Sequence, residues 1–378
     1  MRDHILLPRD PVASPSLTRP NWLTSPERPV GPLWVDKNEN LDPELLAFTA
    51  KILRSLDPIA LCTYPECGPL YKKLAEKFDL PGEHFILSAG SDGAIRYVFE
   101  AYVNPGDVVV HTAPTFAMYP VYAAMYGAKT VPLEYQPSQD GPLLTVDDVI
   151  STLKRARPKL FCLPNPDSPS GTIFPPDELE AIVRCTWDVG SVALIDEAYF
   201  PFYSQTALQW TRKYPHLVIA RTFAKAWGLA GLRIGFAAAS PSLAQYLHKV
   251  RPMYETNTVG VVFMEKMLDH EDQMLASVQR LNEGKAYFIA QMRHLGFRTL
   301  RNEGNFLHVA FGRHYEAITQ KLDGKVLYRK NFKEPCLAGF SRFSSTTKTL
   351  FEPVVRMIEE VVTPNLSREK DRVTEITY

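Results

Sequence analysis

The stretch RTFAKAWGLAGLRIG, residues 221–235, contains a single lysine, Lys225, among small and apolar residues with an arginine near each end. Lysine is costly to bury and is rarely found fully inside a protein. Lys225 therefore either turns outward to water or carries an amine that the fold uses. The residues that surround it in the fold decide between these two possibilities.

Lys225 comes shortly after the apolar run LVIART, and two earlier runs are followed by polar residues in a similar way. Asn165 follows KLFCLP, and Asp196 ends VALID, so the three polar residues are spaced by about 30 positions along the chain. In an open α/β sheet, ligands bind beyond the carboxyl ends of the strands. We therefore expect Asn165, Asp196 and Lys225 to meet at one edge of a sheet.

Short apolar runs rich in β-branched residues alternate with amphipathic runs through the first two thirds of the chain, which predicts a mostly parallel sheet flanked by helices. The predicted strands are FILS (85–88), VVVHT (108–112), KTVPLEY (129–135), KLFCLP (159–164), VALID (192–196), LVIART (217–222) and IGFAAA (234–239). After Ser240 the pattern changes to a long helical stretch, roughly 265–295, and a compact α+β unit. The predicted divisions are an N-terminal arm (1–44), a large domain (45–245), a small domain (246–363) and a polar tail (364–378).

The composition excludes several classes of partner. The chain has 378 residues and a formal net charge of +0, which gives no electrostatic reason to expect nucleic acid or an anionic membrane. No run of about 18 apolar residues is present, so no membrane span is expected. Five cysteines without a CxxC pair, and histidines without metal-binding spacing, predict a cytoplasmic protein with reduced thiols and no metal site.

Each of the three polar residues also has an ordinary interpretation. Asp196 could cap a turn, Lys225 could be a solvated surface lysine, and the segment that begins at Asn165 could be a simple Pro/Ser/Gly turn. VALID followed by a second acid also suits a nucleotidase, but the nearest string, GAKT (127–130), lacks the glycines of a phosphate loop. Together, the lysine, carboxylate and amide suit a pyridine-aldehyde cofactor instead, because they can bind its aldehyde, ring nitrogen and ring oxygen.

The chain resembles the fold-type I pyridoxal-phosphate enzymes of the class I/II aminotransferases, and within them the histidinol-phosphate aminotransferase group. The strings that carry the resemblance run in family order over about residues 35–362. They are KNEN (37–40), TYPECGPLYKKLAEKF (63–78), SAGSDGAI (88–95), NPGDVVV (104–110), PTFAMY (114–119), NPDSPSG (165–171), DEAYFPF (196–202), RTFAKAWGLAGLRIGF (221–236) and SRFSSTT (341–347).

The resemblance implies a role in cofactor binding for a set of residues along the chain. Lys225 would bind the cofactor aldehyde and move protons, Asp196 would pair with the ring nitrogen, and Phe116 would stack on the ring. Asn165 and Tyr199 would contact the ring oxygen. The phosphate would be held by the residues that begin a helix, a hydroxyl, an arginine and a tyrosine from a partner subunit, namely Ser91, Asp92, Thr222, Arg233 and Tyr64.

The resemblance also implies a substrate site and a homodimer. Arg342 would bind the carboxylate or phosphate of a substrate, and Arg329 would be a second anion-binding arginine, with a solvated surface charge as its alternative. The implied reaction is transamination between an amino donor, glutamate, and a keto acceptor. A phosphoamino-acid decarboxylase on the same fold and a non-catalytic binding protein remain open. Ala224 replaces the family's serine before the lysine, so one phosphate contact is lost.

Overall fold

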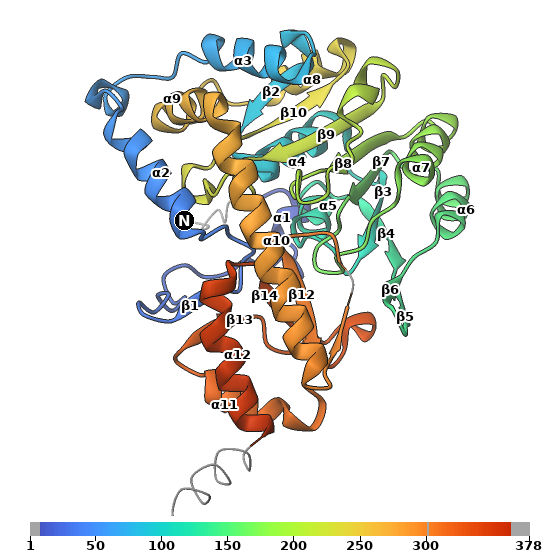
Figure 1. Cartoon of the computed structure of the whole chain (residues 1–378). Coiled ribbons are helices and arrows are strands. Elements are labelled where there is room, and N and C mark those ends of the chain that lie inside the picture. Colours follow the sequence, from blue (N-terminus) through green and yellow to red (C-terminus); the bar gives the residue numbers. More distant parts are fainter. Residues whose placement is uncertain (1–7, 301, 364–378) are drawn as a thin grey trace, which may run out of the picture.

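The computed structural model describes residues 8–300 and 302–363, and it shows a large sheet with helices around it and a smaller α+β unit beside it (Figure 1). The predicted polar tail, 364–378, lies outside the described residues. The helices are α1 (Asp10–Ala13), α2 (Pro43–Arg54), α3 (Gly68–Phe78), α4 (Gly90–Tyr102), α5 (Met118–Met125), α6 (Val146–Ala156), α7 (Pro176–Asp188), α8 (Pro241–Val250), α9 (Thr258–Met267), α10 (Glu271–His294), α11 (Tyr315–Leu322) and α12 (Lys348–Val362).

The predicted mostly parallel sheet is confirmed, and all seven predicted strands belong to it. In chain order they are β2 (Phe85–Ser88), β3 (Val108–Ala113), β4 (Lys129–Glu134), β7 (Leu160–Pro164), β8 (Val192–Asp196), β9 (Leu217–Thr222) and β10 (Gly235–Ala239). Their order in the sheet is β2-β10-β9-β8-β7-β3-β4, and β10 alone runs antiparallel to both of its neighbours. The carboxyl ends of β7, β8 and β9 therefore lie side by side.

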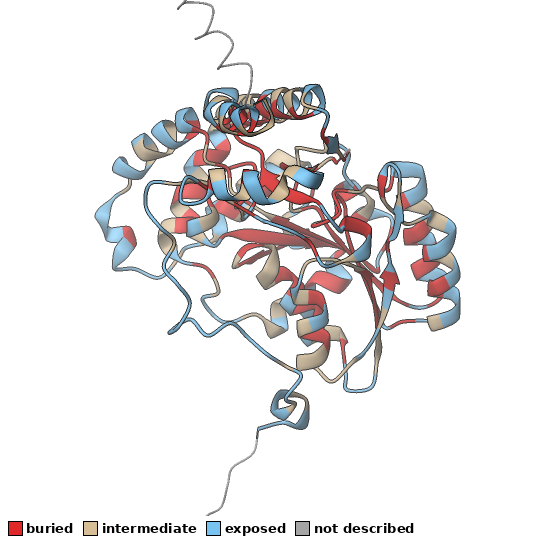
Figure 2. Cartoon of the chain, turned by 90° about the horizontal axis from the view of Figure 1, so that it is seen from below, coloured by how far each residue is buried: buried red, intermediate tan, exposed pale blue. Residues whose placement is uncertain are grey.

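The strand side chains alternate between two buried layers. In β7, Phe161 and Leu163 belong to one apolar cluster, whereas Leu160 and Cys162 belong to the cluster on the opposite face. Such alternation is the period of two that a strand imposes. Because helices cover both faces, the runs are apolar throughout, and the central sheet is buried (Figure 2).

Helix starts follow the local sequence. α2 begins at Pro43, and the Asp42 carboxylate accepts a hydrogen bond from the Glu44 N–H. Thr145 and Asp148 form a capping box at the start of α6. These side chains satisfy backbone donors that the first helical turn leaves unpaired.

The predicted helical stretch over roughly 265–295 is present, but it is divided between two α-helices. The chain forms α9 and α10 with a short 3-10 helix, Leu268–His270, between them. His270 has φ −124° and ψ 44°, which is not helical, and its ring packs edge-on against Phe48 at 5.1 Å between centroids. The apolar pattern continues through this change of direction, so periodicity does not reveal it.

The smaller unit is built on an antiparallel sheet of β11 (Arg298–Thr299), β12 (Phe306–Ala310) and β14 (Ser341–Ser344). From the predicted arm, β1 (Leu33–Val35) pairs in parallel with β13 (Val326–Tyr328) of this unit, and the short hairpin β5 (Gln136–Ser138) and β6 (Gly141–Leu143) extends from the large unit. α10 extends alongside both units (Figure 1). The domain boundaries stay a prediction. None of the described helices is both long enough and apolar enough to span a bilayer.

Helix α10 packs so closely on the segment after β14 that one added methyl group in the helix should destabilise the protein. A Cβ at Gly284 would lie 1.9 Å from the Thr346 carbonyl oxygen and 2.8 Å from the Lys348 nitrogen. Gly284→Ala is therefore expected to lower the free energy of unfolding by about 1–3 kcal/mol through overpacking. Chemical denaturation measures this change. Gly68→Ala is the control, since no atom lies within 4 Å of its Cβ. Equal stability of both variants would contradict the close packing.

Candidate functional site

A cavity of about 620 Å³ lies at the carboxyl ends of β7, β8 and β9, where the large unit, the arm and the small unit meet. Its walls include most of the residues that the sequence predicts for the site. These are Ser91, Asp92, Phe116, Asp196, Tyr199, Thr222, Lys225, Arg233, Arg329 and Arg342. Asn165 and Tyr64 are not among the residues that line it.

Asp196 ends β8, and its carboxylate is buried at the cavity wall. One oxygen accepts a hydrogen bond of 3.1 Å from the Tyr119 hydroxyl, and the other accepts one of 3.0 Å from the Ala198 N–H. Burial raises the pKa of Asp196 to about 7, while both hydrogen bonds act in the opposite direction. At neutral pH, Asp196 is therefore close to the midpoint of its titration, and its protonated and ionised forms are both populated.

Lys225 follows β9 and directs its amine into the cavity. The amine donates a hydrogen bond of 3.0 Å to the backbone carbonyl of Lys37, and it lies 6.0 Å from the centre of the Tyr199 ring. Loss of hydration, followed by the charge of Arg342, lowers the pKa of Lys225 to about 8. A substantial part of this amine is neutral near physiological pH and can act as a nucleophile or a base.

The start of α4 and the segment after β9 form a cradle of donors. Gly90 begins α4 with φ +74°, and a Cβ there would lie 3.0 Å from a terminal nitrogen of Arg233 and 3.5 Å from the Thr222 hydroxyl. Ser91 and Asp92 follow in the first turn, where backbone N–H groups have no partner within the helix. A helix N-terminus next to an arginine and a hydroxyl suits a phosphate group.

Tyr199 and Phe116 provide the aromatic side of the cavity. Asn38 donates a hydrogen bond of 2.9 Å to the Tyr199 hydroxyl, and the Ser168 hydroxyl also interacts with it. Burial raises the pKa of Tyr199, so this phenol remains protonated at neutral pH. Phe116 is half-buried, with its ring edge-on to Tyr119 at 5.9 Å.

Asn165 lies directly after β7, as expected, but it does not line the cavity. Its amide donates to the Phe174 carbonyl at 3.1 Å and its side-chain oxygen accepts from the Phe174 N–H at 2.8 Å. Both polar ends of the side chain therefore support the backbone behind the cavity wall. Ser168, three residues later, lines the cavity beside Tyr199 instead. The sequence analysis missed Ser168 and Asn38, although both lie in the strings that carry the family resemblance.

Arg342 and Arg329 face each other across a backbone bridge, each accepting and donating one main-chain hydrogen bond. Arg342 is only 7% exposed, and it donates to the Asp36 carbonyl at 3.0 Å and to the Ser168 hydroxyl at 3.4 Å. The Arg329 side chain is 47% exposed and lies 3.7 Å from Glu334. Two like charges are thus held at one end of the cavity, and one of them has a nearby carboxylate.

Tyr64 lies on the surface, away from the cavity of its own chain. Its side chain is 71% exposed, and its ring stacks on that of Tyr254 at 4.2 Å between centroids. The GAKT string of the nucleotidase alternative also lacks the required setting, because Lys129 and Thr130 begin strand β4 rather than a helix. A phosphate loop must lead into a helix N-terminus.

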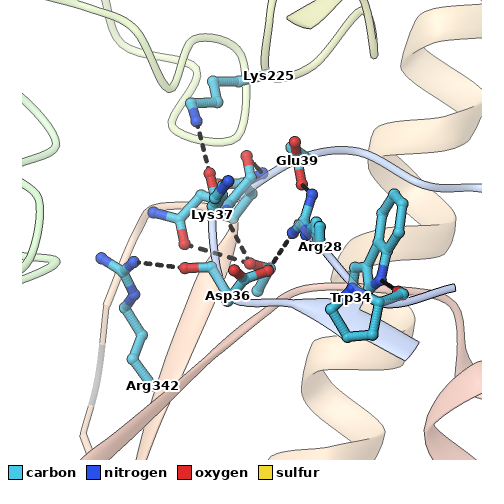
Figure 3. Close-up of polar contacts among 11 residues, drawn as sticks. Arg28, Trp34, Asp36, Lys37, Glu39, Lys225 and Arg342 are labelled. Carbon is cyan, nitrogen blue, oxygen red and sulfur yellow. Dashed lines mark hydrogen bonds and ion pairs between the residues drawn. The ribbon is translucent and has the colours of Figure 1, made fainter. Parts of the chain in front are cut away.

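The arm residues 36–39 form one wall of the cavity and are fixed by Arg28 (Figure 3). The Arg28 guanidinium bonds to the carboxylates of both Asp36 and Glu39, and it lies 4.3 Å from the Trp34 ring centre. The Arg28 side chain is only 19% exposed. Figure 3 shows the opposite side of the same segment, where Lys225 bonds to the Lys37 carbonyl and Arg342 to the Asp36 carbonyl.

Removal of the Arg28 side chain is expected to loosen this wall. Arg28→Ala leaves Asp36 and Glu39 without their shared cation, and two such ion pairs contribute on the order of 1 kcal/mol each. Opening of segment 36–39 should become up to roughly thirtyfold more frequent, measured as the rate of limited proteolysis in the arm. Glu27→Ala, at the exposed neighbouring position, is the control. An unchanged cleavage rate in Arg28→Ala would show that the ion pairs do not hold the arm.

The residues present fit pyridoxal 5′-phosphate. A phosphate cradle, an amine of lowered pKa and a buried carboxylate lie in one cavity, and the Phe116 ring also lines it. The cofactor needs a donor set for its phosphate, a lysine for its aldehyde and an acid for its ring nitrogen. Arg342 and Arg329 remain available beside this set.

Comparison with known proteins agrees with this fit. The family model for class I and II aminotransferases matches residues 37–358. The histidinol-phosphate aminotransferase of a Thermoanaerobacter species is 27% identical over 332 residues, which is 87% of this chain and 92% of that protein. Histidinol-phosphate aminotransferase 1 of Pseudomonas fluorescens is 28% identical over 350 residues, or 91% and 93% of the two chains. The decarboxylase alternative is not favoured.

Solved structures share the fold. The histidinol-phosphate aminotransferase of Sinorhizobium meliloti, in complex with pyridoxal-5′-phosphate, superposes with a TM-score of 0.76 at 22% identity, covering 88% of this chain and 92% of that one. A mutant aspartate aminotransferase from Thermus thermophilus gives 0.72 at 20% identity, covering 88% and 97%. Since the family model matches most of its length, the chain belongs to the class I and II aminotransferases, which depend on pyridoxal 5′-phosphate.

Proposed function

We propose that this aminotransferase moves an amino group between glutamate and a keto or phosphorylated carbonyl substrate, in the manner of the histidinol-phosphate aminotransferases. The observation that carries the proposal is the placement of the Lys225 amine, the Asp196 carboxylate and two arginines in one cavity. The names of the relatives from Thermoanaerobacter and Pseudomonas support the substrate class. No observation favours a second function.

The residues of the large unit would hold the cofactor. When bound, pyridoxal phosphate supplies an aldehyde that takes up the amino group and a ring that accepts the electrons of a substrate carbanion. The phosphate would lie at the N-terminus of α4, with Thr222 and Arg233 as further donors. Asp196 would pair with the ring nitrogen, and Phe116 would pack on one face of the ring.

Lys225 would move the proton that transamination requires. Its amine lies at the base of the cavity, and its pKa of about 8 gives it a neutral fraction that can accept the substrate α-proton. The ammonium form can return that proton to another carbon. Tyr199 would donate to the ring oxygen, because Asn38 already donates to the phenolic oxygen and leaves its proton free for that role.

Arg342 would bind the carboxylate of the amino acid. It is nearly buried, and its present acceptors, a backbone carbonyl and a hydroxyl, are neutral groups. A carboxylate or phosphate accepts a stronger, charge-assisted hydrogen bond from a guanidinium and can replace them. Arg329 would bind the second anionic group of a phosphorylated substrate, and Glu334 would occupy it when that group is absent.

We infer a homodimer from the position of Tyr64. The exposed Tyr64 ring is held by Tyr254, and exposed Leu61 and Met253 lie near them in the sequence. A second copy would cover this surface and receive the Tyr64 hydroxyl at its phosphate cradle. Five free cysteines support a cytoplasmic location, where thiols remain reduced.

Glutamate is the donor that tests the proposed reaction. The protein loaded with pyridoxal phosphate should change its visible absorption on addition of excess L-glutamate and release 2-oxoglutarate, one equivalent per site. Lys225→Ala should bind the cofactor but lose this conversion by at least a thousandfold, since it lacks the proton-moving amine. Release of carbon dioxide without a keto acid would contradict transamination.

The lowered pKa of Lys225 predicts how its modification depends on pH. Below about pH 8 the amine is mostly protonated and cannot attack the cofactor aldehyde, so attachment should accelerate as pH rises through about 8 and then level off. Borohydride reduction followed by peptide mass spectrometry measures the fraction attached at residue 225. Lys285, whose pKa burial also lowers to about 8, is the internal control, because it does not line the cavity. A midpoint near pH 10 would contradict the buried environment.

A further inference from the structure

Tyr119 is a buried side chain at the site to which neither the sequence analysis nor the family resemblance assigned a role. It lies in the first turn of α5, three residues after Phe116, and it is 0% exposed. Its hydroxyl donates a hydrogen bond of 3.1 Å to one oxygen of Asp196. A buried phenol needs a polar partner, and here that partner is the one acid expected at the cofactor ring.

Most of the charged groups that face Asp196 are acids. Asp92 faces it from α4, Glu197 follows it in the chain, and Asp167 lies close on the segment after β7. On the other side, Lys225 and Tyr199 face it across the cavity, and Cys162 approaches from β7. Burial and the acids favour the protonated form, whereas Lys225 favours the carboxylate only while its own amine is charged.

Two donors favour the ionised form. The Ala198 N–H binds one oxygen, and the Tyr119 hydroxyl binds the other. Both bonds also restrain the rotation of the side chain, since each oxygen is held from a different element. The backbone donor belongs to the turn after β8, but Tyr119 reaches Asp196 from a helix far away in the sequence and can be removed by a single substitution.

We propose that Tyr119 is a positioning residue that keeps the Asp196 side chain ionised and oriented toward the ring nitrogen of the cofactor. The inference rests on the proposed cofactor role of Asp196. It adds that the acid alone is insufficient, because burial and the neighbouring acids favour its protonated form and the hydrogen bond from the phenol opposes them. The phenol therefore acts on the cofactor through Asp196 and does not itself touch the ring.

The test is the affinity of the cofactor-free protein for pyridoxamine 5′-phosphate, which has no aldehyde and forms no bond to Lys225. The dissociation constant is measured from pH 5.5 to 9 for the unmodified protein and for Tyr119→Phe. A lost charge-assisted hydrogen bond raises the pKa of Asp196, so the carboxylate is lost at a higher pH. The pH midpoint of the affinity should move up by about one unit. The variant should bind about tenfold more weakly at pH 6 and nearly normally at pH 9.

Tyr135→Phe is the matched control. Tyr135 is also buried and donates 2.9 Å to a different buried acid, Asp167, whose pKa burial raises to about 7. Its midpoint should not move up, because the lost bond raises the pKa of Asp167 and so weakens the negative charge that Asp167 places near Asp196. Thermal unfolding of each variant checks that the fold is retained. An unmoved midpoint in Tyr119→Phe, or an equal loss of affinity at every pH, would overturn the proposal.

The variant Asp196→Asn separates the cofactor role of the acid from the positioning role of the phenol. Weak affinity in Asp196→Asn together with a shifted midpoint in Tyr119→Phe supports both the acid's role and that of the phenol. Weak affinity in Asp196→Asn with an unmoved midpoint in Tyr119→Phe rejects the phenol's role alone. Unchanged affinity in Asp196→Asn rejects the cofactor role of Asp196 and the inference that rests on it.

Discussion

The alignment of three buried strand ends is the constraint on which the site depends. In the parallel register of β7, β8 and β9, Pro164 lies opposite Asp196, and Asp196 lies opposite Ala220. The segments that leave these strands therefore start at one edge of the sheet, whatever their own sequences are. A slip of one residue would turn Asp196 to the other face. The apolar side chains that bury the two faces of the sheet thus also place the Asp196 carboxylate at the cavity.

Two cations of the cavity, Lys225 and Arg342, are held by neutral acceptors, although carboxylates are close. Lys225 and Arg342 donate to the backbone carbonyls of Lys37 and Asp36, while the Asp36 side chain is bound by Arg28. A direct ion pair would hold each cation more tightly than a carbonyl does. Arg28 thus diverts the arm's negative charge away from the cavity. This arrangement leaves Lys225 and Arg342 without a carboxylate partner among the described residues, so that they can bind anionic ligands. It also makes the arm a wall that contacts both of these residues.

The sheet could be predicted from the sequence more completely than the functional site could. The seven strands were predictable because each is a short β-branched run between turn signals, and burial on both faces requires such runs. The positions of Asp196 and Lys225 at the cavity were predictable because Asp196 ends β8 and Lys225 follows β9. Asn165 satisfied the same rule, yet its amide supports the Phe174 backbone, and Ser168 faces the cavity. Which residue of a loop faces inward depends on the path of the loop, and no periodicity records that path.

Contacts between segments that are distant in the sequence could not be predicted, for a different reason. Tyr119 reaches Asp196 across 77 positions of the chain, and Asn38 reaches Tyr199 across 161. A single sequence shows that these residues are polar or aromatic but not which partner each of them meets. The break between α9 and α10 was hidden in the same way, since His270 turns aside to pack on Phe48. Such pairings depend on how whole elements pack, so they became visible only with the fold.

The two arginines at the far end of the cavity should differ in how strongly they select a substrate. Arg342 is nearly buried, so an anion that reaches it interacts in a medium of low dielectric constant, where charge pairing is strong. Arg329 is about half exposed and has Glu334 close by, so water and a competing carboxylate weaken its attraction. An anionic group at Arg329 must displace or outweigh Glu334, whereas one at Arg342 displaces only neutral acceptors. An anionic group of a ligand should therefore be bound more strongly at Arg342 than at Arg329.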